Sequence, residues 1–246
     1  MHSLPELTGT LECMHREQRI EGPDKLLNTS TKKAAIYDHI LNKLMTGQYR
    51  FGEKILVKGL SEETGVSRQP IMSALSNLQE RGFVQITAQV GCTVYNPSIQ
   101  EVSDFYRVFG SNEGLIAALA AERCLDEEKQ RLEEINEKIE QINPRSRGVE
   151  LSYMKLNEEF HNHLHLMARS PLISRQQMAN FQLSDFFIVQ SCGFQAHIDD
   201  ATEEHGSIIE AINSGEPDAA QQSANRHIEN IARQVLEAMA SGRVGG

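Results

Sequence analysis

From Ser98 to its C-terminal end, the sequence carries helical hydrophobic periodicity and no segment that alternates as a half-buried strand does. Ser98 and Glu101 have the spacing of a capping box, which starts a helix. Breaks follow at Asn143-Pro144, Ser170-Pro171, Cys192-Gly193 and Gly215-Glu216-Pro217. We therefore predict an all-α bundle of about six helices, near residues 99–122, 126–142, 149–168, 172–192, 198–213 and 217–240.

Residues 31–97 follow another pattern. A helical stripe ends at Gly47, a second helix covers about 57–64, and a third runs from the capping residue Ser67 to about Arg81. Two short strands, 83–87 and 92–95, are joined by the tip Ala88-Gln89-Val90-Gly91. Three helices followed by a hairpin predict a winged helix-turn-helix, so the fold class is mainly α, with this domain N-terminal to the bundle.

The first 30 residues show no sustained period and contain Gly22-Pro23, so we expect a mobile N-terminal tail over 1–30. The remaining chain divides at Asn96-Pro97 into a winged domain, 31–97, and an all-helical domain, 98–246. No apolar run reaches the ~18–20 residues of a membrane span, and no signal peptide is visible. Four cysteines lie far apart without a CxxC pair, which predicts reduced thiols and a cytoplasmic location.

Charge separates the same domains. The net charge of −10 divides into −2 over residues 1–30, +3 over 31–97 and −11 over 98–246. Local charge decides whether a surface binds phosphates, so the acidic total does not exclude a nucleic-acid partner for the winged domain. The acidic excess of the bundle is interpreted as a solvated surface.

The third helix of the winged domain has two faces. Ile71, Ala74, Leu75 and Leu78 share the inward side, whereas Arg68, Gln69, Met72, Ser73 and Ser76 lie on the side that can enter a major groove. The hairpin tip at Gln89–Gly91 is a candidate wing. The alternative is an ordinary three-helix core with a polar surface, and the local positive charge favours DNA binding over it.

A resemblance supports this prediction. The runs Tyr49–Ile55, Leu60-Ser61-Glu62, Gly65–Ile71 and Ala74–Leu78, with the closing Gly82-Phe83-Val84 and Gly91–Val94, resemble the winged-helix domain of GntR-family bacterial transcription regulators. The resemblance implies double-stranded operator DNA as the partner, contacted by Lys58, Ser67, Arg68 and the wing near Gly91. Met72-Ser73 stand where the family has Arg-Glu, so the operator sequence cannot be carried over from relatives.

In the helical domain, three histidines stand on apolar faces of three separate predicted helices: His161, His205 and His227. Each alone is more often a core histidine that a neighbour satisfies. Three together favour a metal site, because neutral imidazole is a common ligand of Zn, Ni, Cu and Fe. Asn157 precedes His161 by one turn and offers a fourth, oxygen ligand. His39, His163, His165 and His197 are expected to be exposed or at an interface.

The runs Asn157–His161, Glu204-His205 and His227 resemble the FCD domain, the effector domain of the FadR subfamily of these regulators. The resemblance implies one divalent ion, Zn or Ni, held by Asn157, His161, His205 and His227, with a small carboxylate effector beside it. The family's Asp is replaced by Asn157, so either the metal affinity falls or an anion completes the shell. Phe109 occupies the place of a family Arg near the pocket.

These patterns together predict a ligand-responsive transcription regulator and not an enzyme. A homodimer is implied by the resemblance, and the stripe Val108, Leu115 and Leu119 is either core or the dimer seam. Two alternatives stay open. Three histidines with an open position also suit a metal-dependent enzyme, and Cys124 or Cys192 could serve a thiol redox sensor, although no basic neighbourhood supports one.

Overall fold

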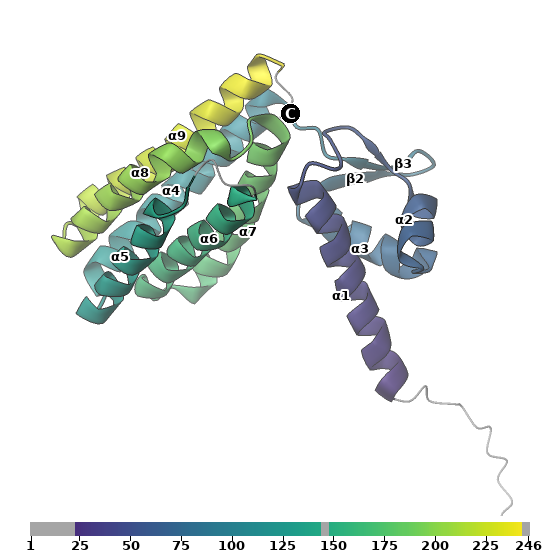
Figure 1. Cartoon of the computed structure of the whole chain (residues 1–246), viewed down its shortest axis with the longest axis horizontal. Coiled ribbons are helices and arrows are strands. Elements are labelled where there is room, and N and C mark those ends of the chain that lie inside the picture. Colours follow the sequence, from purple (N-terminus) through teal and green to yellow (C-terminus); the bar gives the residue numbers. More distant parts are fainter. Residues whose placement is uncertain (1–22, 144–147, 243–246) are drawn as a thin grey trace, which may run out of the picture.

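The computed structural model describes residues 23–143 and 148–242 and consists of a small winged part followed by a helical bundle (Figure 1). In the winged part, a three-stranded antiparallel sheet in the order β1-β3-β2 lies beside three helices. Its elements are α1 (Pro23–Met45), β1 (Lys54–Ile55), α2 (Val57–Thr64), α3 (Arg68–Glu80), β2 (Val84–Thr87) and β3 (Gly91–Val94). The predicted fold class, a winged helix-turn-helix plus an all-α bundle, is confirmed.

Two details of the winged part differ from the prediction. Helix α1 begins at Pro23, so residues 23–30, which we had placed in the N-terminal tail, form its first turns. Proline suits the first turn of a helix because no hydrogen bond is required of its nitrogen. Residues 1–22 lie outside the described residues. Strand β1 was missed because two residues are too short to show alternation, yet Lys54 and Ile55 pair with Thr93 and Cys92.

The bundle contains six helices among the described residues. They are α4 (Ile99–Arg123), α5 (Asp126–Glu140), α6 (Val149–Met167), α7 (Pro171–Ser191), α8 (Gln195–Asn213) and α9 (Pro217–Ala240). Their bounds lie close to the predicted ranges. The capping box forms as expected, because Ser98 Oγ accepts from Glu101 N at 3.2 Å and Glu101 Oε2 accepts from Ser98 N at 2.8 Å.

Two glycines set the contact between α4 and α9. A Cβ atom at Gly114 would lie 2.8 Å from the backbone oxygen of Gln221, and one at Gly110 would lie 2.7 Å from Asn225 Oδ1. Only glycine allows the two backbones to approach this closely without a shift. Helix α9 carries His227 of the histidine cluster described below, and α4 carries Glu113, which contacts His161, so this close contact helps to define the site.

Helix α7 joins the bundle to the winged part. The Gln190 side chain is buried, and its Nε2 donates to Leu44 O at 3.3 Å and to Tyr49 O at 2.8 Å. Its Oε1 accepts from Phe51 N at 3.0 Å. Two turns earlier, Gln182 Oε1 accepts from an arginine of the winged part, Arg81, at 2.6 Å. No helix in the described part of the chain is long and apolar enough to cross a membrane.

Candidate functional site

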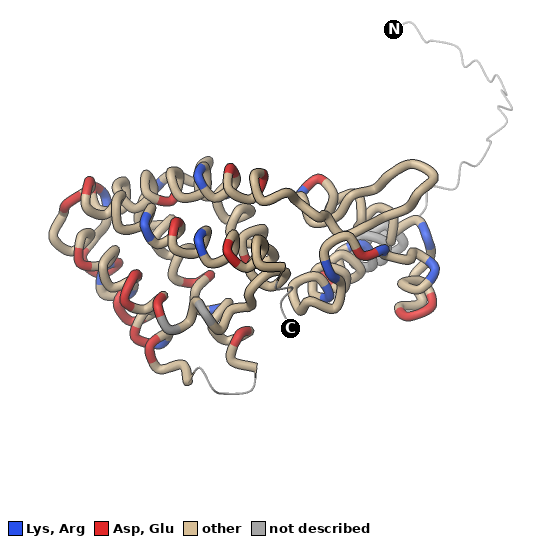
Figure 2. Tube along the Cα trace, turned by 90° about the horizontal axis from the view of Figure 1, so that it is seen from above, with Lys and Arg blue, Asp and Glu red and all other residues tan. Residues whose placement is uncertain are grey.

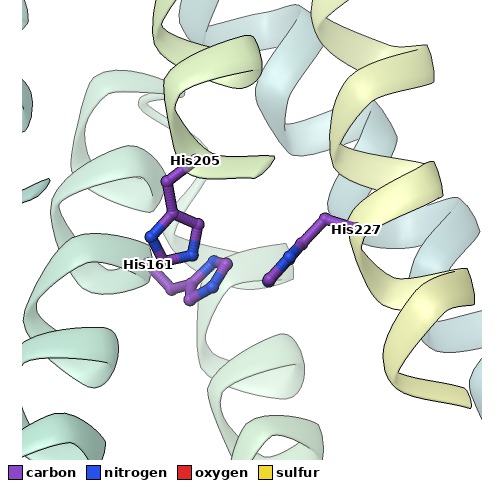
Figure 3. Close-up of side chains that lie close together, drawn as sticks. All are labelled: His161, His205 and His227. Atoms are coloured by element: carbon purple, nitrogen blue, oxygen red, sulfur yellow. The ribbon is translucent and has the colours of Figure 1, made fainter. Parts of the chain in front are cut away.

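Three buried imidazoles converge inside the bundle (Figure 3). His161 comes from α6, His205 from α8 and His227 from α9, and one ring nitrogen of each lies within 4.8 Å of the others. The ring centroids are 5.3 Å apart for His161 and His205, 4.9 Å for His205 and His227, and 5.4 Å for His161 and His227. The structure therefore brings together the three histidines that the sequence singled out.

The facing nitrogens of the cluster have no hydrogen-bond partner. His161 Nε2, His227 Nε2 and both ring nitrogens of His205 are buried and unpaired. Burial lowers the pKa of His161 to about 4 and holds the pKa of His205 well below its ordinary value. The His161 and His205 rings are therefore neutral at pH 7, which is the form of imidazole that binds a metal ion. Buried polar atoms without partners are rare and call for an explanation.

Glu113 on α4 fixes the orientation of His161. Its side chain is fully buried, and its Oε1 accepts from His161 Nδ1 at 2.9 Å. Its Oε2 accepts from His165 Nε2 at 3.0 Å and from Gln177 Nε2 at 3.1 Å. Burial acts to raise the pKa of Glu113, and its two histidine partners outweigh burial and hold the pKa below its ordinary range. The carboxylate is thus ionised, and it directs His161 Nε2 toward the cluster.

Glu204 on α8 fixes the orientation of His227. His227 Nδ1 donates to Glu204 Oε2 at 2.6 Å, and Asn230 Nδ2 donates to Oε1. Burial acts to raise the pKa of Glu204, but the hydrogen bond from His227 outweighs it, so the pKa lies below its ordinary value. A carboxylate behind each of two histidines is a common arrangement around protein-bound zinc, because it fixes the tautomer and makes the ring more basic.

The remaining predicted ligand, Asn157, lies one turn before His161 on α6. Its side chain is 8% exposed, and its Oδ1 is buried without a partner. Phe109 is fully buried and packs edge-to-face on Phe181, with the ring centroids 4.7 Å apart. Phe181 in turn lies 4.2 Å from the His161 ring. Aromatic rings, not a guanidinium, therefore cover this side of His161.

Two histidine predictions were wrong. His165 is 3% exposed and His197 is 4% exposed, although both were expected at the surface or an interface. His165 follows His161 by four residues and so shares its helix face, a signal that could have placed it inside. Glu113 and Glu204 were missed as site residues, since a glutamate on a helix shows no sign of burial until its partners on other helices are known.

Cys124 and Cys192 do not have the environment of reactive thiols. Cys192 Sγ lies 3.4 Å from His197 Nε2, and burial raises the pKa of the Cys192 thiol. Burial also raises the pKa of Cys124. A raised pKa leaves less thiolate, which is the reactive form. The thiol-sensor alternative therefore has no support in the described geometry.

The predicted DNA-contacting face lies on α3 and the hairpin. Ser67, Arg68 and Gln69 at the start of α3 are exposed. Gly91 is also exposed, and it is the first residue of β3 rather than part of the tip. Lys58 on α2 is exposed and lies 3.7 Å from Glu62. The inward set Ile71, Ala74, Leu75 and Leu78 is buried, as predicted.

Two features sharpen this face. Met72 is half-buried and packs on the core, so only part of its side chain can reach a groove. Arg68 has no carboxylate within ion-pair distance among the described residues, which leaves its guanidinium free for a base or phosphate.

Figure 2 shows acidic positions spread over the bundle, in line with its charge of −11.

With this geometry described, the chain was compared with known proteins. Residues 32–94 match the family described as "Bacterial regulatory proteins, gntR family". Residues 105–230 match the FCD domain family. The two matches fall on the winged part and on the helical bundle, and the second covers the three histidines, Asn157 and both carboxylates.

Curated relatives span most of the chain. A probable D-xylose utilization operon transcriptional repressor from Paenarthrobacter nicotinovorans is 20% identical over 210 residues, covering 85% of this chain and 91% of the relative. The transcriptional repressor NanR of Cronobacter sakazakii is 26% identical over 189 residues, covering 68% of this chain and 70% of the relative. Both relatives are named as transcriptional repressors.

Solved structures show the same fold. McbR/YncC of E. coli has a TM-score of 0.66 at 16% identity and covers 84% of this chain and 97% of its own. A GntR regulator from Rhodococcus sp. RHA1 has a TM-score of 0.66 at 15% identity, covering 85% of this chain and 99% of its own. At these identities the likeness concerns the fold alone.

Proposed function

The chain belongs to the GntR family of bacterial transcription regulators and carries an FCD domain, and from this premise we propose that a divalent metal ion and a small carboxylate, bound in the bundle, control its affinity for an operator. GntR regulators bind DNA and FCD domains bind small-molecule effectors. Since the families and relatives are regulators, the expectation that this chain is not an enzyme is confirmed. The histidine cluster therefore calls for a sensing role.

The observation that carries the metal proposal is the set of buried, unpaired acceptor atoms. His161 Nε2, His227 Nε2, a ring nitrogen of His205 and Asn157 Oδ1 are the donor atoms that we assign to the ion. Nitrogen ligands of this kind suit Zn or Ni. When bound, the ion supplies a positive charge and an open coordination position for an anionic effector.

The replacement of the family's Asp by Asn157 makes all four ligands neutral. Glu113 and Glu204 offset this loss, because each places a negative charge directly behind a histidine of the cluster. A carboxylate effector then completes the neutralisation of the ion. A site of this kind favours anionic over neutral effectors, which supports an organic acid as the ligand class.

On the DNA side, we assign base and phosphate contacts to Arg68, Gln69 and Ser67, with the hairpin near Gly91 as the wing. A second copy of the chain would bind the second half-site of the operator. The exposed side chains of Val108, 61% exposed, and Leu115, 44% exposed, lie two turns apart on α4 and support a dimer seam there rather than a core position.

The DNA assignment is tested with a fragment selected from genomic DNA, by fluorescence anisotropy at fixed salt. Arg68→Ala is expected to weaken operator binding about tenfold or more, since it removes a groove contact. Arg107→Ala is the control, because Arg107 is an exposed arginine on α4 whose loss leaves α3 intact. Equal affinity of Arg68→Ala and wild type would contradict the assignment of α3 as the reading helix.

The metal assignment is tested on the same samples. Untagged wild-type protein is expected to contain about one Zn or Ni per chain by elemental analysis, and His205→Gln to lose it. Removing the ion with a chelator should change operator affinity in wild type and leave His205→Gln unaffected. Wild-type protein that neither contains nor rebinds an ion would refute the sensing half of the proposal and leave the DNA half standing.

A further inference from the structure

A surface cavity of about 500 Å³ opens at the junction of α6 and α7. It contains none of the residues assigned to the metal ion or to DNA. Leu166, Pro171 and Met178 give it apolar walls, and three basic side chains, His165, Arg169 and Arg175, also line it. No Asp or Glu is among the described residues that line this cavity. The chemistry of its walls is therefore that of a site for an anion with an apolar body.

The two arginines are placed to hold a carboxylate. Arg169 Nη1 donates to Met167 O at 2.8 Å, and its Nη2 donates to Glu128 Oε1 at 3.1 Å and to Oε2 at 2.9 Å. These contacts fix the guanidinium at the cavity, and the ion pair with Glu128 offsets part of its charge. Arg175 donates from Nε to Pro171 O at 3.4 Å, and no carboxylate among the described residues pairs with it. A fixed guanidinium beside an unpaired one suits a carboxylate, which can accept from both.

The N-terminal end of α7 adds to this positive field. Ser170 and Pro171, at the start of the helix, line the cavity. The Ser170 side chain makes no capping hydrogen bond, and the first turn of α7 has no acidic residue. The partial positive charge of this helix end is therefore not offset by the protein's own side chains.

His165 provides an independent sign of a missing partner. It lines the cavity although only 3% of the residue is exposed, and its Nδ1 is buried without a hydrogen bond. Its other nitrogen, Nε2, donates to Glu113, the carboxylate that also accepts from His161. Nδ1 is therefore an acceptor, and the partner it lacks is a donor group of a ligand or a water, not the carboxylate itself. A ligand in the cavity would thus touch a residue that shares its hydrogen-bond partner with the histidine cluster.

We propose that the α6–α7 cavity is a second binding site, separate from the histidine cluster, for an organic carboxylate with an apolar body. Arg169, Arg175 and the start of α7 bind the carboxylate, and Leu166, Pro171 and Met178 contact the apolar part. Because binding free energies at coupled sites are reciprocal, occupancy of this site and of the cluster influence each other through His165 and Glu113.

The test uses the full chain and isothermal titration calorimetry with 4-phenylbutyrate, a carboxylate with an apolar body. Wild type is expected to bind it, and Arg175→Gln to bind at least about tenfold more weakly. Arg169→Gly should weaken it similarly, and it keeps the fold because Arg169 sits at φ +51°, where glycine is at ease. Arg107→Gln, an exposed arginine elsewhere, should bind like wild type.

Further variants and ligands separate this proposal from its rivals. His205→Gln, which lacks a cluster ligand, should still bind 4-phenylbutyrate, with an affinity within about tenfold of wild type that reports the coupling between the sites. Complete loss of binding in this variant would place the anion at the cluster and overturn the second site. 4-Phenylbutanol and inorganic phosphate should both bind at least about tenfold more weakly, since each lacks half of the required chemistry; equal binding of either would refute the ligand class. Failure of wild type to bind 4-phenylbutyrate would refute the proposal. A changed sedimentation coefficient for Arg175→Gln would then indicate that the cavity is a contact between copies of the chain.

Discussion

Asp185 is an acidic residue whose surroundings disfavour its ionised form. It lies on α7 and lines a cavity of about 250 Å³ shared with Leu41 and Met45 of α1 and with Glu158 of α6. Burial, and secondly the negative charge of Glu158, raise the pKa of Asp185 to about 8. The folded protein thus binds a proton here at neutral pH, at the boundary between the winged part and the bundle.

This shift predicts a pH dependence of stability. Because the folded-state pKa exceeds the unfolded value near 4, the unfolded state releases the proton first, and the free energy of unfolding falls as pH rises from about 4 to 8. Asp185→Asn removes this term, so it should be more stable than wild type by about 1–2 kcal/mol at pH 8 and similar at pH 4, after allowance for partial exposure. Urea unfolding at several pH values measures it. Asp104→Asn, an exposed control, should keep the wild-type dependence of unfolding free energy on pH. If the curve of Asp185→Asn also ran parallel to that of wild type, the raised pKa of Asp185 would be contradicted.

The histidine cluster was foreseeable from sequence, whereas its supports were not. His161, His205 and His227 stood out because imidazole is unusual on an apolar helix face. Glu113 and Glu204 could not be identified, because their burial depends on how α4 and α8 meet α6 and α9. The order in which helices pack is a property of three dimensions that periodicity along one chain does not contain.

At the scale of elements, the pair α4 and α9 determines how the bundle closes. Gly110 and Gly114 lie one turn apart on α4, and both face α9. Ala, Ser or a larger residue at Gly114 would force the two backbones apart, whereas at Gly110 the Asn225 side chain would first have to move. Because Glu113 is next to Gly114, any such shift would also move the carboxylate that holds His161.

Gly114→Ala is therefore expected to lower the free energy of unfolding by about 1–3 kcal/mol, because its Cβ would lie 2.8 Å from the Gln221 backbone oxygen. Gly206→Ala on α8 is the matched control, since nothing lies within 4 Å of its Cβ position. That change should raise stability by about 0.5–1 kcal/mol through helix propensity. Chemical denaturation measures the free energy of unfolding of both variants. Equal changes in the two variants would mean that α4 and α9 are not in close contact.

Most elements could be predicted because Pro, Gly and capping residues mark their ends. The Ser98–Glu101 box and the break at Gly215–Pro217 gave helix limits within a few residues of the observed ones. Strand β1 and the start of α1 could not be found in this way. The first depends on pairing with β3, and the second begins at a proline that also marks turns.

Helix α7 contacts both the histidine cluster and the winged part. Near its middle, Phe181 lies against the His161 ring and Gln177 donates to Glu113. Near its end, Gln190 binds three backbone groups of the winged part. A displacement of α7 by an occupant of the bundle would therefore be felt directly by the DNA-binding part.

Gln190→Ala is expected to loosen this connection. It leaves Leu44 O, Tyr49 O and Phe51 N without the side chain that satisfies them, at a cost of about 2–4 kcal/mol. Calorimetry should then resolve separate unfolding transitions for the two parts, whereas a single transition is expected for wild type. Gln182→Ala, which loses only the contact with Arg81, should have the smaller effect. A single, unshifted transition for Gln190→Ala would argue against α7 as the mechanical link.

Gln190 also bears on how hybrid regulators can be built from this protein. The chain passes from one part to the other at residues 95–98, but the Gln190 side chain that connects them lies 139 residues beyond Phe51. A chimera joined only at residues 95–98 would therefore keep the covalent connection and lose the hydrogen bonds of Gln190. A foreign sensor domain fused to this winged part would therefore need a glutamine placed like Gln190, in contact with Leu44, Tyr49 and Phe51, before it could be expected to control DNA binding.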